Sequence, residues 1–186
     1  NMYEYIRKRL ENIQKNSIIL IIIPNQQYHD INLFLLKYWM DISKGNGVYV
    51  SLNRPYRNLL ENFSTGKIEH NNLFFIDCVT KNEVDVANCY FLKTQQSLTN
   101  LSIAISTIIK QENPSFIFLD SLNTLALYNE MDATVKFTQF FVTKLRTNNV
   151  DGIILAIEES RNKKLIMGLS QMCDKVIDMT DTTFLV

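Results

Sequence analysis

The chain has 186 residues, of which 46% are hydrophobic and 20% are charged, a composition typical of a globular domain rather than a disordered segment. The 19 Lys and Arg residues balance the 19 Asp and Glu residues, so no charge excess points to nucleic acid or an anionic membrane as a partner. The longest aliphatic run, 18–23, is far shorter than the ~20 residues of a membrane span, and we expect no membrane segment.

Three cysteines are present, and their spacing indicates neither a disulfide framework nor a zinc site. Cys78, Cys89 and Cys173 are odd in number, and no CxxC pair occurs. Reduced thiols are typical of the cytoplasm, so we expect a cytoplasmic protein, and we expect it to hold no metal or cofactor.

An amphipathic helix is predicted at the start of the chain, within residues 1–16, where Tyr5, Ile6 and Leu10 fall on one face at helical spacing. We expect this helix to dock on the domain or on a partner. Its apolar face is therefore one candidate docking surface. The remaining residues, 17–186, are predicted to form a single domain.

Apolar runs that suit buried strands alternate with longer helical segments along the rest of the chain. Several runs are continuously hydrophobic, which is typical of parallel strands covered on both faces. The alternation predicts βαβ units and the α/β fold class with a mostly parallel sheet. We expect strands at 17–23, 48–52, 73–76, 116–119, 153–157 and 176–179, with a further short strand at 89–92. We expect helices at 31–42, 56–63, 98–109 and 133–145, and a hairpin turned at Thr180-Asp181.

The turn after the first predicted strand reads PNQQYHD, residues 24–30, and neither glycine nor lysine occurs from Pro24 to Leu36. A phosphate loop at such a turn needs glycines so that successive N–H groups converge on the phosphate, and a lysine to neutralise its charge. Here Asp30 instead adds a negative charge, and like charges at ~4 Å repel by ~1 kcal/mol in water and more in a cleft. The turn therefore predicts a strand–helix connection that does not hold a phosphate.

Asp120 follows four apolar residues at the carboxyl end of a predicted strand, the edge where open α/β sheets bind ligands. In P-loop ATPases an acidic residue at this place helps to hold Mg²⁺. The alternative is that Asp120 caps the next helix or bonds a neighbouring loop.

Three segments, GVYVSLNRPYRNLLENF (47–63), NLFFIDCVT (72–80) and PSFIFLDSLNTLALY (114–128), resemble the KaiC-like branch of the RecA-like P-loop ATPase superfamily. The resemblance spans roughly 17–179 and implies a RecA-like three-layer α/β/α fold. It also implies ATP bound between subunits of a ring, in timing, signalling or motility machinery. Aligned with that family, Asp30 takes the place of the phosphate-loop lysine and Ile31 that of the Mg²⁺-binding hydroxyl.

A second departure from the family lies after the second predicted strand. The resemblance implies a pair of glutamates there that position the attacking water, and this chain has Asn53 and Arg54. Asp120 is then the one matching position, and we interpret it as structural. The hypothesis is a non-catalytic pseudo-ATPase that acts as a regulatory, signalling or scaffold protein. Its expected partner is a protein, either an active KaiC- or RecA-like ATPase or a second copy in a homo-oligomer.

Basic residues near the end of the chain are the candidates for contact with such a partner. Arg161, Lys163 and Lys164 could reach a neighbour's nucleotide, although a solvated charged loop is the more common role of such a run.

Two other functions stay open. The first is a sensor that binds a nucleotide or another small ligand in the altered cleft, lined by His29, Asp30, Asn53, Arg54 and Asp120. The second is a recombination paralogue that assists DNA repair, which the neutral charge disfavours. Within the cleft, His29 could act as a base, but a residue in the first turn of a helix is the more common role. Asp30 is expected to cap the helix that follows.

Overall fold

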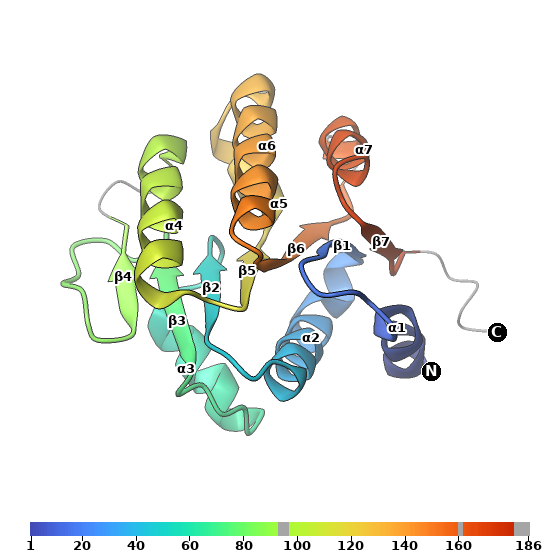
Figure 1. Cartoon of the computed structure of the whole chain (residues 1–186), viewed down its shortest axis with the longest axis horizontal. Helices are drawn as coiled ribbons and strands as arrows, with labels where there is room; N and C mark the ends of the chain where they lie inside the picture. Colours follow the sequence, from blue (N-terminus) through green and yellow to red (C-terminus); the bar gives the residue numbers. More distant parts are fainter. Residues whose placement is uncertain (93–96, 160–161, 181–186) are drawn as a thin grey trace.

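The computed structural model describes residues 1–92, 97–159 and 162–180. Within them, parallel strands form one seven-stranded sheet in the order β4-β3-β2-β5-β6-β1-β7 (Figure 1). The α/β class and the parallel sheet expected from the sequence are confirmed, and so is the short strand at 89–92. The strands are β1 Ile18–Ile23, β2 Gly47–Ser51, β3 Leu73–Asp77, β4 Cys89–Phe91, β5 Phe116–Asp120, β6 Asp151–Ile157 and β7 Lys175–Asp178.

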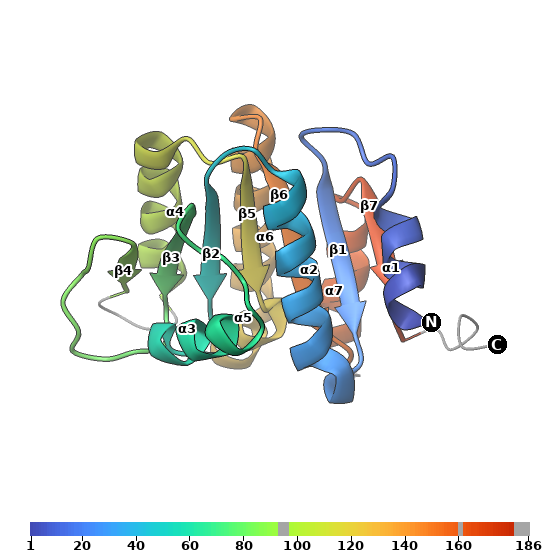
Figure 2. The same ribbon diagram turned by 90° about the horizontal axis from the view of Figure 1, so that it is seen from below.

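Helices cover both faces of the sheet and give three layers (Figures 1 and 2). One face carries α1 Met2–Leu10, α2 Tyr28–Ile42 and α3 Tyr56–Thr65. The other carries α4 Leu98–Glu112, α5 Leu122–Tyr128, α6 Met131–Thr147 and α7 Lys163–Ser170. The sequence did not predict α5 or α7, since both are short and about two turns of apolar periodicity give a weak signal. None of the described helices is long and apolar enough to cross a bilayer.

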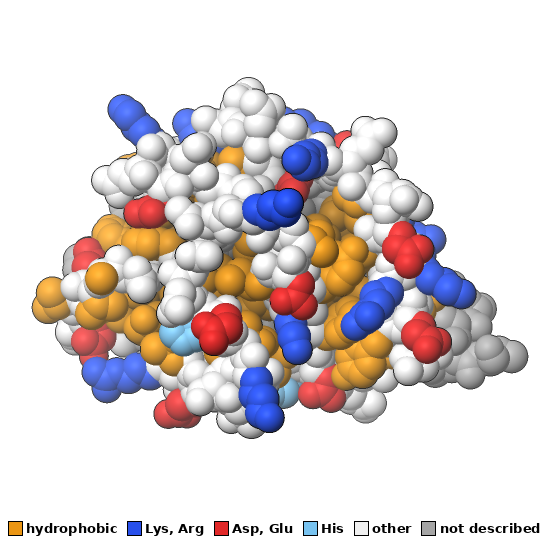
Figure 3. All heavy atoms as spheres, turned by 60° about the horizontal axis from the view of Figure 1, so that its bottom comes forward, with side chains coloured by type: hydrophobic (Ala, Val, Ile, Leu, Met, Phe, Trp, Pro, Cys, Tyr) orange, Lys and Arg blue, Asp and Glu red, His pale blue; other side chains and the backbone are white. Residues whose placement is uncertain are grey.

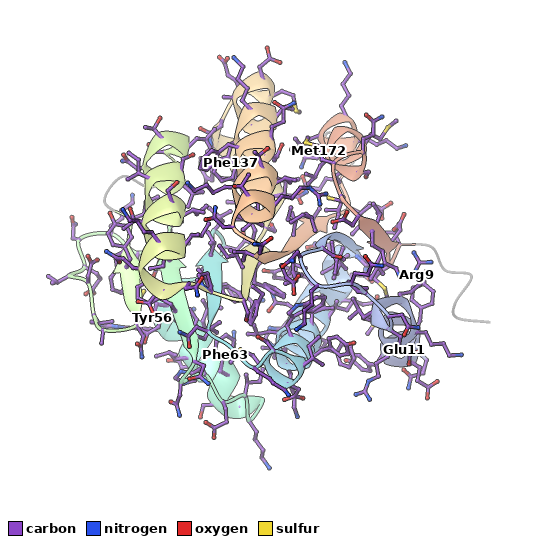
Figure 4. The ribbon with its side chains drawn as sticks, viewed as in Figure 1. Arg9, Glu11, Tyr56, Phe63, Phe137 and Met172 are labelled. Carbon is purple, nitrogen blue, oxygen red and sulfur yellow. The ribbon has the colours of Figure 1, made fainter. Side chains whose placement is uncertain are left out.

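The apolar run of β1 illustrates why the core has two halves. Ile18, Leu20 and Ile22 face the layer of α4 to α7, and the alternate isoleucines face the layer of α1 to α3. All six β1 side chains are at most 9% exposed. Figure 4 shows Phe63 of α3 and Phe137 of α6 on opposite sides of the sheet. At about 1.5–3 kcal/mol for each fully buried side chain, such burial on both faces is the main stabilising contribution.

The prediction that the first helix offers a free docking surface is wrong. Ile6 is 0% and Leu10 is 3% exposed, because both pack on the domain's own core. Tyr5 is half-buried against the same cluster. The helix docks on its own domain, which was the other alternative.

At the other end of the chain, β7 runs parallel to β1. The predicted hairpin at Thr180-Asp181 extends beyond the described residues.

The outer edge of β4 is covered by the loop that precedes it. Val86 and Cys89 exchange backbone hydrogen bonds of 3.1 and 3.2 Å. The N–H of Phe91 donates to Oδ1 of Asp85 at 2.9 Å. The backbone donors of β4 that face away from β3 are thus satisfied within the chain.

The register of the sheet aligns polar residues at the carboxyl ends of the central strands. Ser51 of β2 lies level with Asp77 of β3 on one side and with Asp120 of β5 on the other. All three are 0% exposed. Buried polar groups at one edge of a parallel sheet form the candidate site, because ligands of such sheets bind there.

Candidate functional site

Asp120 lies at the centre of the carboxyl edge and accepts four side-chain hydrogen bonds. Its Oδ1 accepts from the Tyr28 hydroxyl and, at 3.2 Å, from Asn53 Nδ2. Its Oδ2 accepts from the Tyr49 hydroxyl and, at 2.9 Å, from Asn32 Nδ2. A carboxylate has about four lone-pair positions. This set of donors therefore fills its accepting capacity.

Burial keeps the two tyrosine hydroxyls that donate to Asp120 in their protonated form. Removal from water raises the pKa of the Asp120 carboxyl, while the hydrogen bonds from Tyr28 and Tyr49 act in the opposite direction. Burial also raises the pKa of both tyrosine hydroxyls well above the ordinary value, and the charge of Asp120 adds to that effect. Both hydroxyls therefore keep their protons and remain donors to the carboxylate.

The turn before α2 determines how Tyr28 reaches this carboxylate. In place of an open loop, Asn25–Gln27 form a single 3₁₀ turn, closed by a 3.0 Å hydrogen bond from Gln27 N to Pro24 O. Helix α2 then starts at Tyr28, so Tyr28 and Asn32 lie four residues apart on one helix face. Both side chains point toward β5 as a consequence.

Tyr49 reaches the same carboxylate from the neighbouring strand. It lies on β2 opposite Phe118 of β5, and the two rings stack with centroids 5.4 Å apart. Phe118 is two residues before Asp120 and faces the same side of the sheet. The aromatic stack thus positions the Tyr49 hydroxyl beside Asp120.

The loop after β2 closes the site from outside. Asn53 Nδ2 lies 3.2 Å from the Tyr28 hydroxyl and 3.1 Å from Ser121 Oγ, and Asn53 Oδ1 accepts from the Thr124 hydroxyl. Asn53 therefore connects this loop to α2, β5 and α5 at once.

Arg54 lies above the same group of residues. Its guanidinium is 5.3 Å from the centroid of the Tyr28 ring, and its Nη1 is 2.9 Å from His29 Nδ1. The structure thus brings four of the predicted site residues together around Tyr28: His29, Asn53, Arg54 and Asp120. His29 faces a cation rather than an acid that would activate it as a base.

Asp30 does not cap the helix as expected. The N-cap position of α2 is Gln27, and Asp30 is an exposed residue of the first helical turn. The helix begins earlier than the sequence pattern suggested, because Tyr28 and His29 are already helical. The negative charge of Asp30 is still favourable there, since it lies near the positive end of the helix dipole.

The basic residues predicted to contact a neighbour's nucleotide lie elsewhere. Lys163 and Lys164 are the first two residues of helix α7 and do not lie in a loop. Both side chains are exposed. Arg161 lies outside the described residues.

Sequence reasoning missed the donors Tyr28, Asn32 and Tyr49. The sequence did contain a signal for Asn32. It lies between apolar residues on the predicted buried face of the helix, next to Ile31 and three residues before Leu35, and a buried polar side chain needs a hydrogen-bond partner. Tyr28 had no comparable signal, since its place depends on the 3₁₀ turn.

These side chains do not fit a bound Mg²⁺ and nucleotide phosphate. A metal-bound water at Asp120 would have to displace the Tyr28 or Tyr49 hydroxyl, and no lysine lies in the turn 24–30. Within residues 1–92, 97–159 and 162–180, no three His, Cys, Asp or Glu side chains gather in a way that could hold a metal.

Comparison with known proteins identifies the family. A family model described as ATPase: KaiC matches residues 33–184. The match begins within α2 and includes Asn53, Arg54 and Asp120, while the turn 24–30 precedes it. A search of curated proteins finds no match.

Proposed function

The chain belongs to the KaiC ATPase family, and on this premise we propose that it is a pseudo-ATPase that acts through protein–protein contacts as a regulatory, signalling or scaffold protein. The observation that carries this proposal is the saturated Asp120 carboxylate. In this proposal the carboxyl edge of the sheet, where ligands of such folds bind, holds a buried cluster of hydrogen-bonded side chains instead of a nucleotide.

The surrounding residues support the same conclusion. ATP hydrolysis needs a group that cradles the phosphates and one that positions water. The 3₁₀ turn supplies no lysine, and Asn53 and Arg54 stand where the resemblance implies two acids. The side-chain amide of Asn53 is instead hydrogen-bonded to Asp120 and Ser121, so it stabilises the buried polar cluster.

We expect nucleotide binding to be weak as a result. Titration with ATP and ADP, with and without Mg²⁺, should give no dissociation constant tighter than about 1 mM, because the turn 24–30 has no lysine to compensate the phosphate charge. Equilibrium dialysis with labelled nucleotide and a phosphate-release assay measure binding and turnover. A micromolar dissociation constant with steady phosphate release would overturn the pseudo-ATPase proposal.

A second candidate, a sensor for a nucleotide or another small anion, is favoured by Arg54. Its half-buried guanidinium lies at the same edge beside His29. Micromolar binding without phosphate release, lost in Arg54→Ala, would favour the sensor.

The contact surface proposed for a protein partner is the corner between α5 and α6. Leu127, Tyr128 and Met131 lie within five residues of one another and are 52%, 61% and 36% exposed. Clustered exposed apolar side chains, unlike single ones, are typical of interaction sites. We name these three residues the α5–α6 corner.

A second copy is the first partner to test. We expect the wild-type protein to self-associate at micromolar concentration and the Leu127→Ser/Tyr128→Ser variant to be monomeric, by sedimentation velocity. Ile103→Ser on α4 is the matched control, since Ile103 is 60% exposed and lies outside the corner. A wild-type protein that stays monomeric at about 100 µM contradicts self-association, since a specific contact gives at least about −6 kcal/mol. An active KaiC-type ATPase would then be the partner to test.

A further inference from the structure

A cavity of about 590 Å³ lies at the amino edge of the sheet, opposite the edge that holds Asp120. Three loops form its mouth, namely those before β1, before β2 and before β6, and the end of α2 forms its wall. Its volume is within the ~300–1,000 Å³ of small-molecule sites. Figure 3 shows the side of α1 to α3, where hydrophobic surface is exposed between charged side chains.

The wall of the cavity is apolar and aromatic. Trp39, the chain's one tryptophan, lines it at 3% exposure, and its ring lies 5.6 Å from that of the half-buried Tyr38. Ile42, at 55% exposure, lines the side nearer to solvent. The indole N–H of Trp39 donates to none of the described residues and is not among the fully buried polar atoms, so it can meet an acceptor on a ligand. A flat ring with an acceptor atom suits this wall.

The mouth is lined by amides from two of the loops. Asn12, Asn16 and Asn149 have positive φ angles of 63°, 65° and 56°, a backbone state that asparagine tolerates better than most residues. Within the described part of the chain, their side-chain amides make no hydrogen bond.

The charge of the mouth is positive. Lys15 and Lys44 line it, are exposed, and form no ion pair with a described residue. Asp151 is the one acid in the lining, and its Oδ1 already accepts the Ser17 N–H at 3.1 Å. A ligand that reaches the mouth therefore meets two ammonium groups and one carboxylate, and the charge of Lys15 also acts on that carboxylate.

We propose that this cavity binds a small organic anion that carries an aromatic ring. The ring packs on Trp39 and Tyr38, and the anionic group meets Lys15 and Lys44 at the mouth. The site lies at the opposite edge from Asp120, so it is independent of the proposed function, and either can fail alone.

Trp39 is a built-in reporter for the test. Titration of the protein with 4-nitrobenzoate should quench Trp39 fluorescence saturably, after correction against free tryptophan. The neutral analogue 4-nitrobenzamide has nearly the same shape, so it should bind about tenfold more weakly if the two lysines recognise charge.

Paired variants separate this site from non-specific binding. Lys15→Ala/Lys44→Ala should lower the affinity for 4-nitrobenzoate about tenfold and leave that for 4-nitrobenzamide unchanged. Lys110→Ala/Lys136→Ala, two lysines outside the cavity lining, should change neither. The proposal is overturned if quenching does not saturate, if the two compounds bind equally, or if both double variants behave alike.

Discussion

Replacing Asp120 with alanine is expected to lower the free energy of unfolding by about 4 kcal/mol. The change leaves two tyrosine hydroxyls and two asparagine amides without the acceptor that they share, at a position that is 0% exposed in the wild-type protein. Each buried donor without a partner costs about 1–3 kcal/mol, and local rearrangement recovers part of the sum. Urea denaturation followed by circular dichroism measures the loss.

The matched control for this experiment is Asp132→Ala. Asp132 is an exposed residue in the first turn of α6, and its loss should cost less than about 1 kcal/mol. The comparison also bears on function. An acid retained for catalysis is often neutral or unfavourable for stability, so its removal tends to stabilise the fold. A stability gain in Asp120→Ala would argue that the site still serves a ligand.

Gly47→Ala is expected to destabilise the protein by about 3 kcal/mol, as overpacking in a tight core does. A Cβ atom on Gly47 would lie 2.1 Å from Cζ of Phe116, its partner across β2 and β5, and 2.5 and 2.7 Å from two further ring atoms. Phe116 is 1% exposed, so its ring has no free space into which it can move. Thermal and urea unfolding measure the effect.

Gly168→Ala separates this clash from a general effect of replacing glycine. Nothing lies within 4 Å of a Cβ at Gly168, an exposed position within α7. Alanine there should stabilise the helix by up to about 1 kcal/mol. In the Gly47→Ala background, Phe116→Leu should restore part of the lost stability, because the smaller side chain leaves room for the new methyl group. Equal unfolding midpoints for the two alanine variants would contradict the clash.

The sheet could be predicted from the sequence because its signal is local. Continuous apolar runs such as 18–23 identify strands covered on both faces, and the alternation with helices fixes their parallel direction. The first helix shows the limit of such reasoning. Its periodicity located an apolar face, but whether that face meets the domain or a partner depends on tertiary packing, and Ile6 proved to be covered by the core.

The sequence indicated where the candidate site would lie in the fold, but not which side chains would bond to one another there. Asp120 ends a strand at the edge expected to hold it, Asn53 bonds to it, and Arg54 lies beside His29 at the same edge. Tyr28 could not be predicted as a donor to Asp120. Its hydroxyl reaches the carboxylate because α2 starts at Tyr28, directly after the 3₁₀ turn, and the sequence pattern did not indicate that turn. The absence of glycine and lysine from the turn predicts that it does not bind phosphate. It does not predict that the Tyr28 hydroxyl bonds to Asp120, because that contact depends on three-dimensional packing.

The covered edge of β4 has a consequence for how the protein behaves when it is crowded. An edge strand with unpaired N–H groups is a template on which another chain can add a strand, which leads to aggregation or fibres. In β4 the N–H of Cys89 bonds to Val86 and that of Phe91 to Asp85, so an incoming strand would find these donors occupied. Growth of the sheet is blocked at this end, and any specific assembly there has to form through side chains, which can select a partner where a backbone ladder cannot.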